Sequence, residues 1–456
     1  MKKRIKKRNL VIFTILLILI ICNFTIYLTK NNQKDVTIKQ NLQKEEKNQT
    51  KKERIISNIL VYNTEEIITE EFLEWITEQY SLEILEKIET SLKESENNTK
   101  IWHQLTGNSL YVLFDEYKQI SSNRIKKLTT KAKRSEAILS FIGDVSLADN
   151  WYIMPKYDER GKKIYGILSE NVVEILKSSD ITIANNEFTI SNRGEKMPNK
   201  FYTFRGKSER LNIYNEMGVN LVTLANNHIY DFGEIAFNDS LEALEQYGIP
   251  YIGAGRNIEE ATQPYYYIIN GYKIGFVNAT RAEKFILTPE ATTTTGGVFR
   301  CYNPMSFIDL IQKTKKNSDY VIALVHWGKE DSSELEQVQI ETSKQYIDAG
   351  ADIIIGSHAH TLQGIDFYQD KAIIYNLGDF IFNNETKDTG IFQLKIDSDG
   401  IFSYYFKPCK EENEYTYLLS GEEQKRVLSK IQFLSPNITI KEDGEFYSRN
   451  NTSQSN

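Results

Sequence analysis

Apolar and polar positions divide the chain into regions with different patterns. Residues 10–28 form an uncharged run, whereas residues 31–58 are rich in Lys, Asn, Gln and Glu and hold few apolar side chains. Between residues 59 and 135 apolar side chains recur every three or four positions, which is typical of amphipathic helices. From residue 137 short β-branched runs alternate with helix-period segments, which indicates an α/β fold with a largely buried sheet.

The N-terminal apolar run predicts a membrane anchor. It holds 14 Leu, Ile, Val or Phe among 19 residues and follows the basic segment MKKRIKKRN. At roughly −0.3 to −0.6 kcal/mol for each apolar residue, this composition favours insertion into a bilayer. A cleaved signal peptide is less favoured because no small-residue cleavage site follows, and a lipoprotein is less favoured because Ile21 precedes Cys22. We predict a cytoplasmic tail over 1–9, a transmembrane signal anchor over 10–29 and an extracellular C-terminal domain in a single-pass protein of a bacterial cell membrane.

The two regions after the anchor predict a stalk and a helical module. Residues 30–58 have too few apolar side chains to offset chain entropy, so we predict a flexible stalk. Phe72 and Ile76 share one helical face, and Ser81 is placed to cap the helix that follows. We therefore predict a small helical module over residues 59–135.

The α/β region extends over residues 136–408 and fits one large domain. The Asn-Gly pair at 270–271 and the Asp-Gly pair at 399–400 are turn signals that predict two antiparallel hairpins within it. Residues 409–456 are rich in Asn, Glu and Ser towards their end. We predict that they form a C-terminal extension whose end is disordered.

Charge and cysteine content exclude several classes of protein. The 55 Lys and Arg against 62 Asp and Glu give a net charge of −7, which argues against nucleic acid as a partner. The three cysteines include no CxxC pair, which excludes a disulfide-rich scaffold and a cysteine-ligated metal site. Because Cys22 lies in the apolar run, at most one bridge, between Cys301 and Cys409, is compatible with these positions.

Side chains that can bind metal follow directly after the predicted strands. Four of the five histidines occupy such positions. In open α/β sheets ligands bind beyond the carboxyl ends of the strands, because the loops converge there. Imidazoles with carboxylate and amide oxygens suit transition metals, so we predict one or two divalent ions, of which Mn, Zn and Fe are the leading candidates. The residues concerned are Asp144, Glu187, Asn226, Asn227, His228, His326, His358 and His360.

Six segments, IGDVSL, ANNEF, LANNHIYDFG, HWGKE, GSHAHTLQG and YNLGDFIF, follow one another in the α/β region. Together they resemble the CapA family, which is linked to poly-γ-glutamate capsule synthesis, over residues 137–408. The resemblance implies a four-layer α/β/β/α sandwich like that of calcineurin-like metallophosphoesterases, with the site at the strand ends. Membrane anchoring and extracellular placement also agree with what the family implies.

By similarity to metallophosphoesterases, two metal positions share one carboxylate. The residues implied for the first position are Asp144, Glu187 and His360, and those for the second are Asn227, His326, His358 and the shared Glu187. His228 would stand outside the metals and donate a proton to the leaving group. Asp231 would orient the loop of His228, and Glu330 would support the ligands from outside.

The chain departs from the implied pattern at four positions. Ser146 stands where phosphoesterases of this fold usually have a histidine, and Glu187 replaces the usual bridging aspartate. Compared with other CapA-like chains, Ala359 stands where proline is common and Asp379 where asparagine is common. The first metal position therefore loses an imidazole, and phosphoesterase activity does not follow from the resemblance alone.

Two functions are compatible with the sequence. The first is a metal-dependent hydrolase or transferase that acts on a phosphoester or on a γ-glutamyl polymer. The second is a non-catalytic component of capsule assembly, which binds an anionic surface polymer or braces a membrane synthase complex. Contact with polyglutamate would need a local basic cluster, for which a solvated loop is the plainer interpretation. Its residues are Arg193, Lys196, Lys200, Arg205, Lys207 and Arg210.

Overall fold

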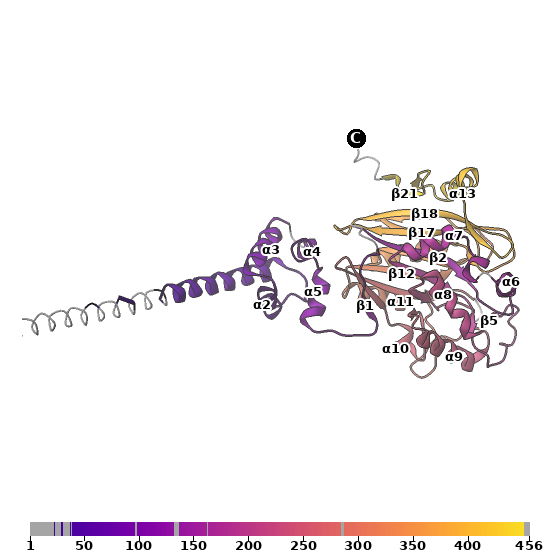
Figure 1. Cartoon of the computed structure of the whole chain (residues 1–456), viewed down its shortest axis with the longest axis horizontal. Coiled ribbons are helices and arrows are strands. Elements are labelled where there is room, and N and C mark those ends of the chain that lie inside the picture. The colour runs from indigo at the N-terminus through magenta and orange to yellow at the C-terminus, as the bar shows by residue number, and fades with distance from the viewer. Residues whose placement is uncertain are drawn as a thin grey trace, which may run out of the picture. The chain divides into compact units, whose positions relative to one another are not determined.

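A computed structural model shows the arrangement of most of the chain (Figure 1). It describes residues 22, 29–30, 37, 39–95, 98–131, 136–161, 163–283 and 287–450. The predicted cytoplasmic tail at 1–9 and nearly all of the predicted anchor at 10–29 lie outside these residues. Within the described part, no helix has both the length and the apolar character needed to cross a bilayer. The chain divides into two compact units after Ile101.

The first unit consists of helices that bury one apolar face. A helix over residues 39–62 is followed by α2 (Glu70–Gln79) and α3 (Leu82–Glu94). The Ser81 side chain accepts a hydrogen bond from the Ile84 amide at the start of α3, as its sequence position predicts. α2 and α3 therefore follow the apolar spacing of the sequence.

The structure has a helix over residues 39–58, where we expected a flexible stalk. Lys, Gln and Glu are strong helix formers, and pairs such as Gln49 donating to Glu53 add support on the exposed side. Ile55 and Ile59 are buried near the end of this helix. Local helix propensity and this apolar end outweigh the low overall hydrophobicity of the segment.

The rest of the predicted helical module belongs to the second unit. Its elements are α4 (Lys100–Thr106), most of which lies beyond the division, α5 (Leu110–Tyr117) and β1 (Ile125–Lys127). The ammonium of Lys273 lies 2.6 Å from Asp115 Oδ2, and both side chains are largely buried. His103 Nε2 lies 2.6 Å from the carbonyl oxygen of Asn270. The expected module over 59–135 is thus divided between the two units.

Two large sheets form the second unit. Sheet 1 has the strand order β1, β9 (Tyr265–Ile269), β10 (Tyr272–Thr280), β12 (Tyr320–Trp327), β13 (Ile353–His358), β15 (Lys371–Ile374), β14 (Ile365–Tyr368). Sheet 2 has the order β20 (Ile438–Ile440), β21 (Glu445–Ser448), β18 (Phe402–Glu411), β17 (Lys387–Ile396), β2 (Ala137–Val145), β3 (Ile181–Asn186), β6 (Leu221–Thr223), β7 (Tyr251–Ile252). In sheet 2, β16 (Asp379–Ile381) pairs with β2 and β19 (Thr416–Leu418) pairs with β18. Two short pairs are β4 (Thr189–Ile190) with β5 (Arg205–Gly206), and β8 (Ala254–Gly255) with β11 (Gly297–Val298).

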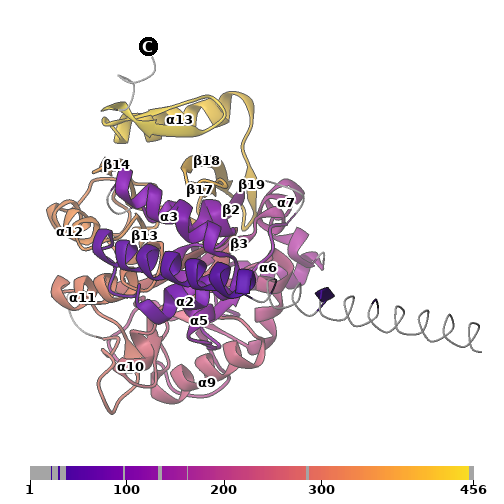
Figure 2. The same cartoon turned by 90° about the vertical axis from the view of Figure 1, so that its left-hand side faces the viewer.

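The two sheets enclose one apolar layer. Helices lie on their outer sides, with α11 (Pro304–Lys315) and α12 (Gln337–Asp348) on one side and α7 (Glu170–Ser178) on the other (Figure 2). In β12, Ile322 and Leu324 pack between the sheets, whereas Val321 and Val325 belong to the cluster under the outer helices. Helices α11 and α12 cover sheet 1, and α7, α8 (Asn212–Met217) and α9 (Gly233–Gln246) cover sheet 2. Shorter helices in the connections are α6 (Ile153–Arg160), η1 (Lys163–Gly166), η2 (Ser208–Leu211) and α10 (Ile258–Ala261). The predicted α/β class is confirmed, and the layers run helix, sheet, sheet, helix.

The β9–β10 and β17–β18 hairpins form around the Asn-Gly and Asp-Gly pairs, as predicted.

The C-terminal segment completes sheet 2. β18 crosses residue 408, where we expected a domain to end, and pairs with β21 of the C-terminal segment. Val427 and Ile431 of α13 (Gly421–Leu434) join the apolar layer between the sheets. Residues 409–450 therefore belong to the second unit, while the predicted disordered end at 451–456 lies outside the described residues.

The two buried cysteines do not form the disulfide that their positions allowed. Cys301 packs in the cluster under the helices of sheet 1, and Cys409 in the cluster under the helices of sheet 2. Both are free thiols. Burial raises the pKa of Cys301 to about 12, so this thiol stays protonated at neutral pH.

A half-buried carboxylate, Asp319, makes the attachment of residues 102–128 sensitive to pH. It accepts hydrogen bonds from Ser109 Oγ at 2.5 Å and from the Lys273 amide at 2.7 Å, and burial raises its pKa from 3.8 to about 6. Because the folded-state pKa lies above the unfolded value, ionisation costs stability at pH 7 and this cost disappears towards pH 4. The change that Asp319→Asn makes to the free energy of unfolding should therefore be more stabilising at pH 7 than at pH 4, by on the order of 2 kcal/mol. Urea unfolding of both proteins at the two pH values measures this, and a pH-independent difference would contradict it.

Candidate metal centre

The carboxyl ends of parallel strands from both sheets meet at one edge of the sandwich. Asp144 at the end of β2 lies opposite Asn185 in β3, and His326 at the end of β12 lies opposite Ser357 in β13. The amide of Asn185 reaches across to His326, with a distance of 3.3 Å to Nδ1. β16 adds Asp379 in register with Asp144. The two sheets thus bring polar residues from distant parts of the sequence to one place.

Two fully buried carboxylates lie at the centre of this edge. The side-chain amide of Asn185 donates to Asp144 Oδ1 at 2.8 Å and to Glu187 Oε2 at 2.9 Å. Burial raises the pKa of both carboxyls, and the charge of Asp144 raises that of Glu187 further. Two acids buried side by side are costly unless a cation compensates them. This place therefore favours a bound positive charge.

Two of the histidines here are held in the neutral form. Burial, reinforced by the neighbouring imidazoles, lowers the pKa of His326 and His358 well below the ordinary value. Their ring centroids lie 4.6 Å apart. His326 Nε2 lies 2.9 Å from Asn227 Oδ1, and its Nδ1 lies 2.9 Å from Ser357 Oγ. Neutral imidazole is the form that binds metal ions.

His360 differs because it faces acids. Its Nδ1 lies 2.7 Å from Asp379 Oδ1 and 3.5 Å from Asp144 Oδ2. Burial works against its charge, but these two carboxylates outweigh burial and raise the pKa of His360 to about 9. His358 and His360 both adopt left-handed backbone conformations, with φ of 95° and 53°. Non-glycine residues adopt such conformations at a cost, so the surrounding contacts hold this loop in a specific shape.

The arrangement fits a divalent transition metal. Three sets of side chains have ligand atoms within 4.8 Å of one another: Glu187, His358 and His360; Asp144, Glu187 and His326; Asp144, His360 and Asp379. Among the described residues at this edge, the buried atoms without a hydrogen-bond partner include Glu187 Oε1 and His358 Nδ1. An ion would satisfy such buried atoms, and mixed imidazole and carboxylate donors suit transition metals. Asp144, Glu187 and His360 each belong to two of the three sets.

His228 stands outside the three sets and pairs with an acid. Its Nδ1 lies 2.8 Å from Asp231 Oδ2. Burial lowers the pKa of His228, while Asp231 opposes this lowering. Phe204 contacts the His228 ring at a centroid distance of 4.4 Å and contacts Phe382, which in turn lies 4.6 Å from the His360 ring. Asp231 therefore holds the imidazole of His228 near the candidate metal ligands.

Lys200 is buried beside this pair rather than exposed in a loop. Its ammonium lies 2.7 Å from Asp231 Oδ1 and 3.2 Å from Glu283 Oε1. It also donates to the backbone oxygen of Asn227. One cation thus joins the segment that carries Asn227 and His228 to the acid that holds His228.

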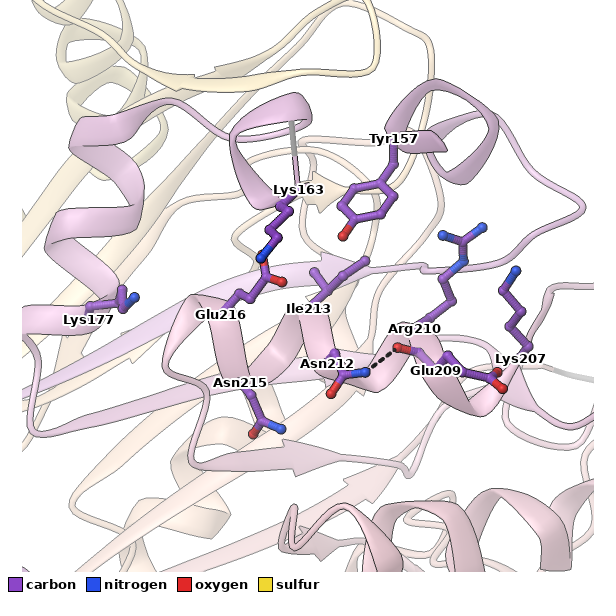
Figure 3. Close-up of a pocket in the computed structure, with 10 residues that line it drawn as sticks. All are labelled: Tyr157, Lys163, Lys177, Lys207, Glu209, Arg210, Asn212, Ile213, Asn215 and Glu216. Carbon is purple, nitrogen blue, oxygen red and sulfur yellow. Dashed lines mark hydrogen bonds between the residues drawn. The ribbon is translucent and has the colours of Figure 1, made fainter. Parts of the chain in front are cut away.

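The basic cluster expected around Lys200 is largely neutralised. Arg193 is paired with Asp239, and Arg210 contacts both Asp149 and Asp158. Arg210 and Lys207 line a pocket of about 610 Å³ on another part of the surface, with Lys163 and Lys177 on its far side (Figure 3). Arg193, Lys200, Lys207 and Arg210 each lie beside a carboxylate of the same chain, so the six residues form no uniform anion-binding surface.

Some residues of the site were not assigned a role from sequence. Asn185 connects both central carboxylates, and its signal was the ANNEF segment. Asp379 was noted only as a departure from a related pattern, yet it holds His360. Glu330, expected to support the ligands, has its Oε1 3.8 Å from His358 Nε2 and a side chain that is 57% exposed. It contributes less to the buried arrangement than Asp379 does.

The solved structures that match this chain are distant from it in sequence and in structure. The protein TT1561 of Thermus thermophilus matches with a TM-score of 0.32 and 8% identity, covering 59% of this chain and 97% of that protein. The 5′-nucleotidase of Candida albicans SC5314 matches with a TM-score of 0.32 and 10% identity, covering 59% of this chain and 50% of that protein.

Sequence comparison gives a more specific result. The family model described as bacterial capsule synthesis protein PGA_cap matches residues 138–384, more than half of the chain. The capsule biosynthesis protein CapA of Bacillus anthracis is 31% identical over 240 residues, which cover 50% of this chain and 58% of that protein. The PGA biosynthesis protein CapA of Bacillus subtilis (strain 168) is 28% identical over 293 residues, which cover 62% of this chain and 74% of that protein. The matched range of the family model contains every residue of the three candidate metal-binding sets, and also His228 and Asp231.

Proposed function

The chain belongs to the bacterial capsule synthesis protein family, and we propose that it is a metal-dependent hydrolase or transferase of poly-γ-glutamate capsule biosynthesis. The relatives in Bacillus, named for capsule and PGA biosynthesis, support the process. The buried set of imidazoles and carboxylates supports the metal. The bond that reacts is a phosphoester or a γ-glutamyl amide, in a site arranged like that of metallophosphoesterases.

The observation that carries the catalytic proposal is the His228–Asp231 pair. A purely structural metal site has no use for a fixed imidazole outside its ligands. Because Nδ1 faces Asp231, Nε2 is the nitrogen left for a leaving group. Burial lowers the pKa of His228, while the facing Asp231 carboxylate favours the protonated ring that a general acid needs.

The other residues of the site have separate tasks. Asp144, Glu187, His326, His358 and His360 would hold the metal, which supplies Lewis acidity to the phosphoryl or carbonyl oxygen of the substrate. Asn227 contributes its side-chain oxygen beside His326. Lys200 keeps the Asn227–His228 segment in place through the Asn227 backbone oxygen and Asp231. Asp379 orients the His360 ring through Nδ1 and leaves Nε2 for coordination.

Turnover measurements test this function directly. The purified protein, loaded separately with Mn, Zn or Fe, would be incubated with a phosphodiester and with a γ-linked glutamate oligomer. The proposal expects turnover of one substrate with at least one metal, and none after chelation. A fully loaded protein that turns over neither substrate would favour the non-catalytic alternative, which the loss of an imidazole at Ser146 also supports.

We also propose that the protein is a single-pass membrane protein with residues 30–456 outside the cell, next to a membrane synthase complex and its polymer. The uncharged run over residues 10–28 after a basic segment supports this placement. Full-length protein should then stay in the membrane after washing with high salt. External protease should release a soluble fragment by cutting between residues 31 and 58, where the described side chains are largely exposed. A mature N-terminus mapped beyond Leu28, with no membrane-bound form, would contradict the anchor.

A further inference from the structure

Three aromatic side chains form a partly exposed patch near the metal centre. The ring centroid of Trp151 lies 4.6 Å from that of Tyr152 and 6.0 Å from that of Tyr202. Tyr152 is 43% exposed and Tyr202 is 63% exposed, whereas Trp151 is partly buried against the core. Apolar side chains that reach the surface as a group, rather than singly, mark binding surfaces. We call these three residues the aromatic patch.

Two buried phenylalanines connect the aromatic patch to the metal centre. The ring of Phe204 lies 4.9 Å from that of Trp151 and 4.4 Å from that of His228. Phe204 also contacts Phe382, whose ring lies 4.6 Å from that of His360. A single ring therefore separates the aromatic patch from His228.

One buried carboxylate fixes both His228 and the segment that carries Tyr202. Asp231 Oδ2 accepts a hydrogen bond from the Phe204 amide at 2.7 Å and lies 2.8 Å from His228 Nδ1. Asp231 Oδ1 lies 2.7 Å from the ammonium of Lys200, two residues before Tyr202. Asp231, His228 and Lys200 are all buried. The position of the aromatic patch is thus tied to that of His228.

The segment that carries Trp151 is fastened to the same strand. Asn150 donates through its side-chain amide to the carbonyl oxygen of Thr203 at 2.8 Å, and its side-chain oxygen accepts from the Arg205 amide at 2.8 Å. The Asp149 amide donates to the Arg205 carbonyl oxygen at 2.8 Å. These bonds hold the two segments together without a ligand, so binding to the aromatic patch needs little further ordering of the chain.

The chemistry of the aromatic patch fits a sugar ring. A pyranose ring has C–H faces, which pack on aromatic rings, and hydroxyl groups at its edge, which need hydrogen-bond partners. The planes of Tyr152 and Tyr202 stand at 60° and 77° to the indole plane, so the three rings can contact a ligand from more than one side. Among the described residues neither tyrosine hydroxyl has a hydrogen-bond partner, so both are available to a sugar hydroxyl.

The cations close to the aromatic patch in the sequence do not favour an anionic ligand. Lys207 and Arg210 lie beside Asp149. The guanidinium of Arg205 lies over the ring of Phe232, at 3.5 Å from its centroid. A polyanion needs cations in excess of the acids around them, which these residues do not provide. An uncharged glycan has no such requirement.

We propose that the aromatic patch binds a sugar ring of an uncharged glycan, which forms part of the substrate at the metal centre. The proposal deepens the proposed function and rests on it, because the bond that reacts is the one named there. The glycan extends beyond that bond on the side of His228, since Phe204 connects the aromatic patch to this histidine.

Calorimetric titration of the full-length protein with two uncharged glycans, an N-acetylglucosamine tetramer and maltotetraose, tests the proposal. We expect at least one of them to bind. Tyr152→Ala combined with Tyr202→Ala should weaken this binding about tenfold, because two ring contacts are lost. Tyr152→Phe combined with Tyr202→Phe should keep most of it, because both rings remain.

The matched control is Tyr368→Ala combined with Tyr405→Ala. It removes two partly exposed tyrosines from β14 and β18, and it should bind glycan as the unmodified protein does. The metal content and melting temperature of each variant show whether it is folded.

Four results would overturn the aromatic patch as a glycan site. These are binding of neither glycan, unchanged binding when Tyr152 and Tyr202 are alanine, equal weakening in both double alanine variants, and tighter binding of adenosine than of either glycan. The outcome is separable from that of the proposed function. Glycan binding that depends on the two tyrosines, without any turnover, would keep the aromatic patch and refute the chemistry, whereas turnover by a protein that binds neither glycan would do the reverse.

Discussion

Replacing His358 by alanine is expected to remove most of the metal that the purified protein carries. His358 shares a ligand set with Glu187 and His360, its pKa is lowered by burial so that the ring is neutral, and its Nδ1 is buried. Losing one nitrogen donor from a small ligand set costs a large part of the binding free energy, and we expect at least a tenfold loss of affinity. Elemental analysis after dialysis against limiting metal measures the effect.

Ser146→Ala is the matched control for that variant. Ser146 is buried at the same edge and its hydroxyl makes no hydrogen bond to a described residue, so its removal should cost little metal and little stability. Equal metal content in the two variants would contradict the assignment of His358. A loss confined to Ser146→Ala would instead show that the hydroxyl takes the place of the missing imidazole.

His228→Ala is expected to separate metal binding from chemistry. The ring lies outside the three ligand sets, so the variant should keep its metal, while the loss of the buried contact with Asp231 should lower its melting temperature. Turnover should fall by about 10²-fold or more, which is the usual contribution of a general acid. The measurements are turnover, metal content and the amount of surface polymer in cells.

His103→Ala is the matched histidine control. His103 stacks on Tyr272 and contacts the carbonyl oxygen of Asn270, at the opposite end of β10 from Thr280, which pairs with His326. It should leave turnover unchanged. If His228→Ala has normal turnover and normal surface polymer, His228 has no part in the mechanism. If the variant lacks turnover but cells still make normal amounts of surface polymer, capsule synthesis does not depend on the catalytic activity of this protein.

Periodicity predicted the elements of the fold better than their grouping. β12 and β13 are continuous apolar strands because both faces are buried, one between the sheets and one under helices, and this shows in the sequence. The grouping of residues 102–128 with the second unit depends on the Lys273–Asp115 pair and on β1 pairing with β9, which are long-range contacts without a local signal. The same holds for β21, which pairs with β18 across α13.

The sequence identified the site residues whose role depends on residue type, but not those whose role depends on how the chain packs. Histidines and acids after strands are visible in a sequence, and the structure brings Asp144, Glu187, His326, His358 and His360 together. The roles of Asp379 and Lys200 could be assigned only from the structure. Asp379 contacts His360 and Lys200 contacts Asp231, and in each pair the two residues lie in different segments of the chain. From the sequence, Lys200 was interpreted as part of a solvated basic cluster, because no sequence pattern indicates that a single lysine is buried.

The central claim is that the strand ends hold a metal ion that the site uses. Anomalous diffraction from crystals of the full chain grown with Mn or Zn, recorded at the absorption edge of the metal, tests it most directly. We expect at least one peak within coordination distance of Glu187 Oε1 and the His358 and His360 side chains. No peak at this position, with ordered water in contact with these side chains instead, would contradict the account.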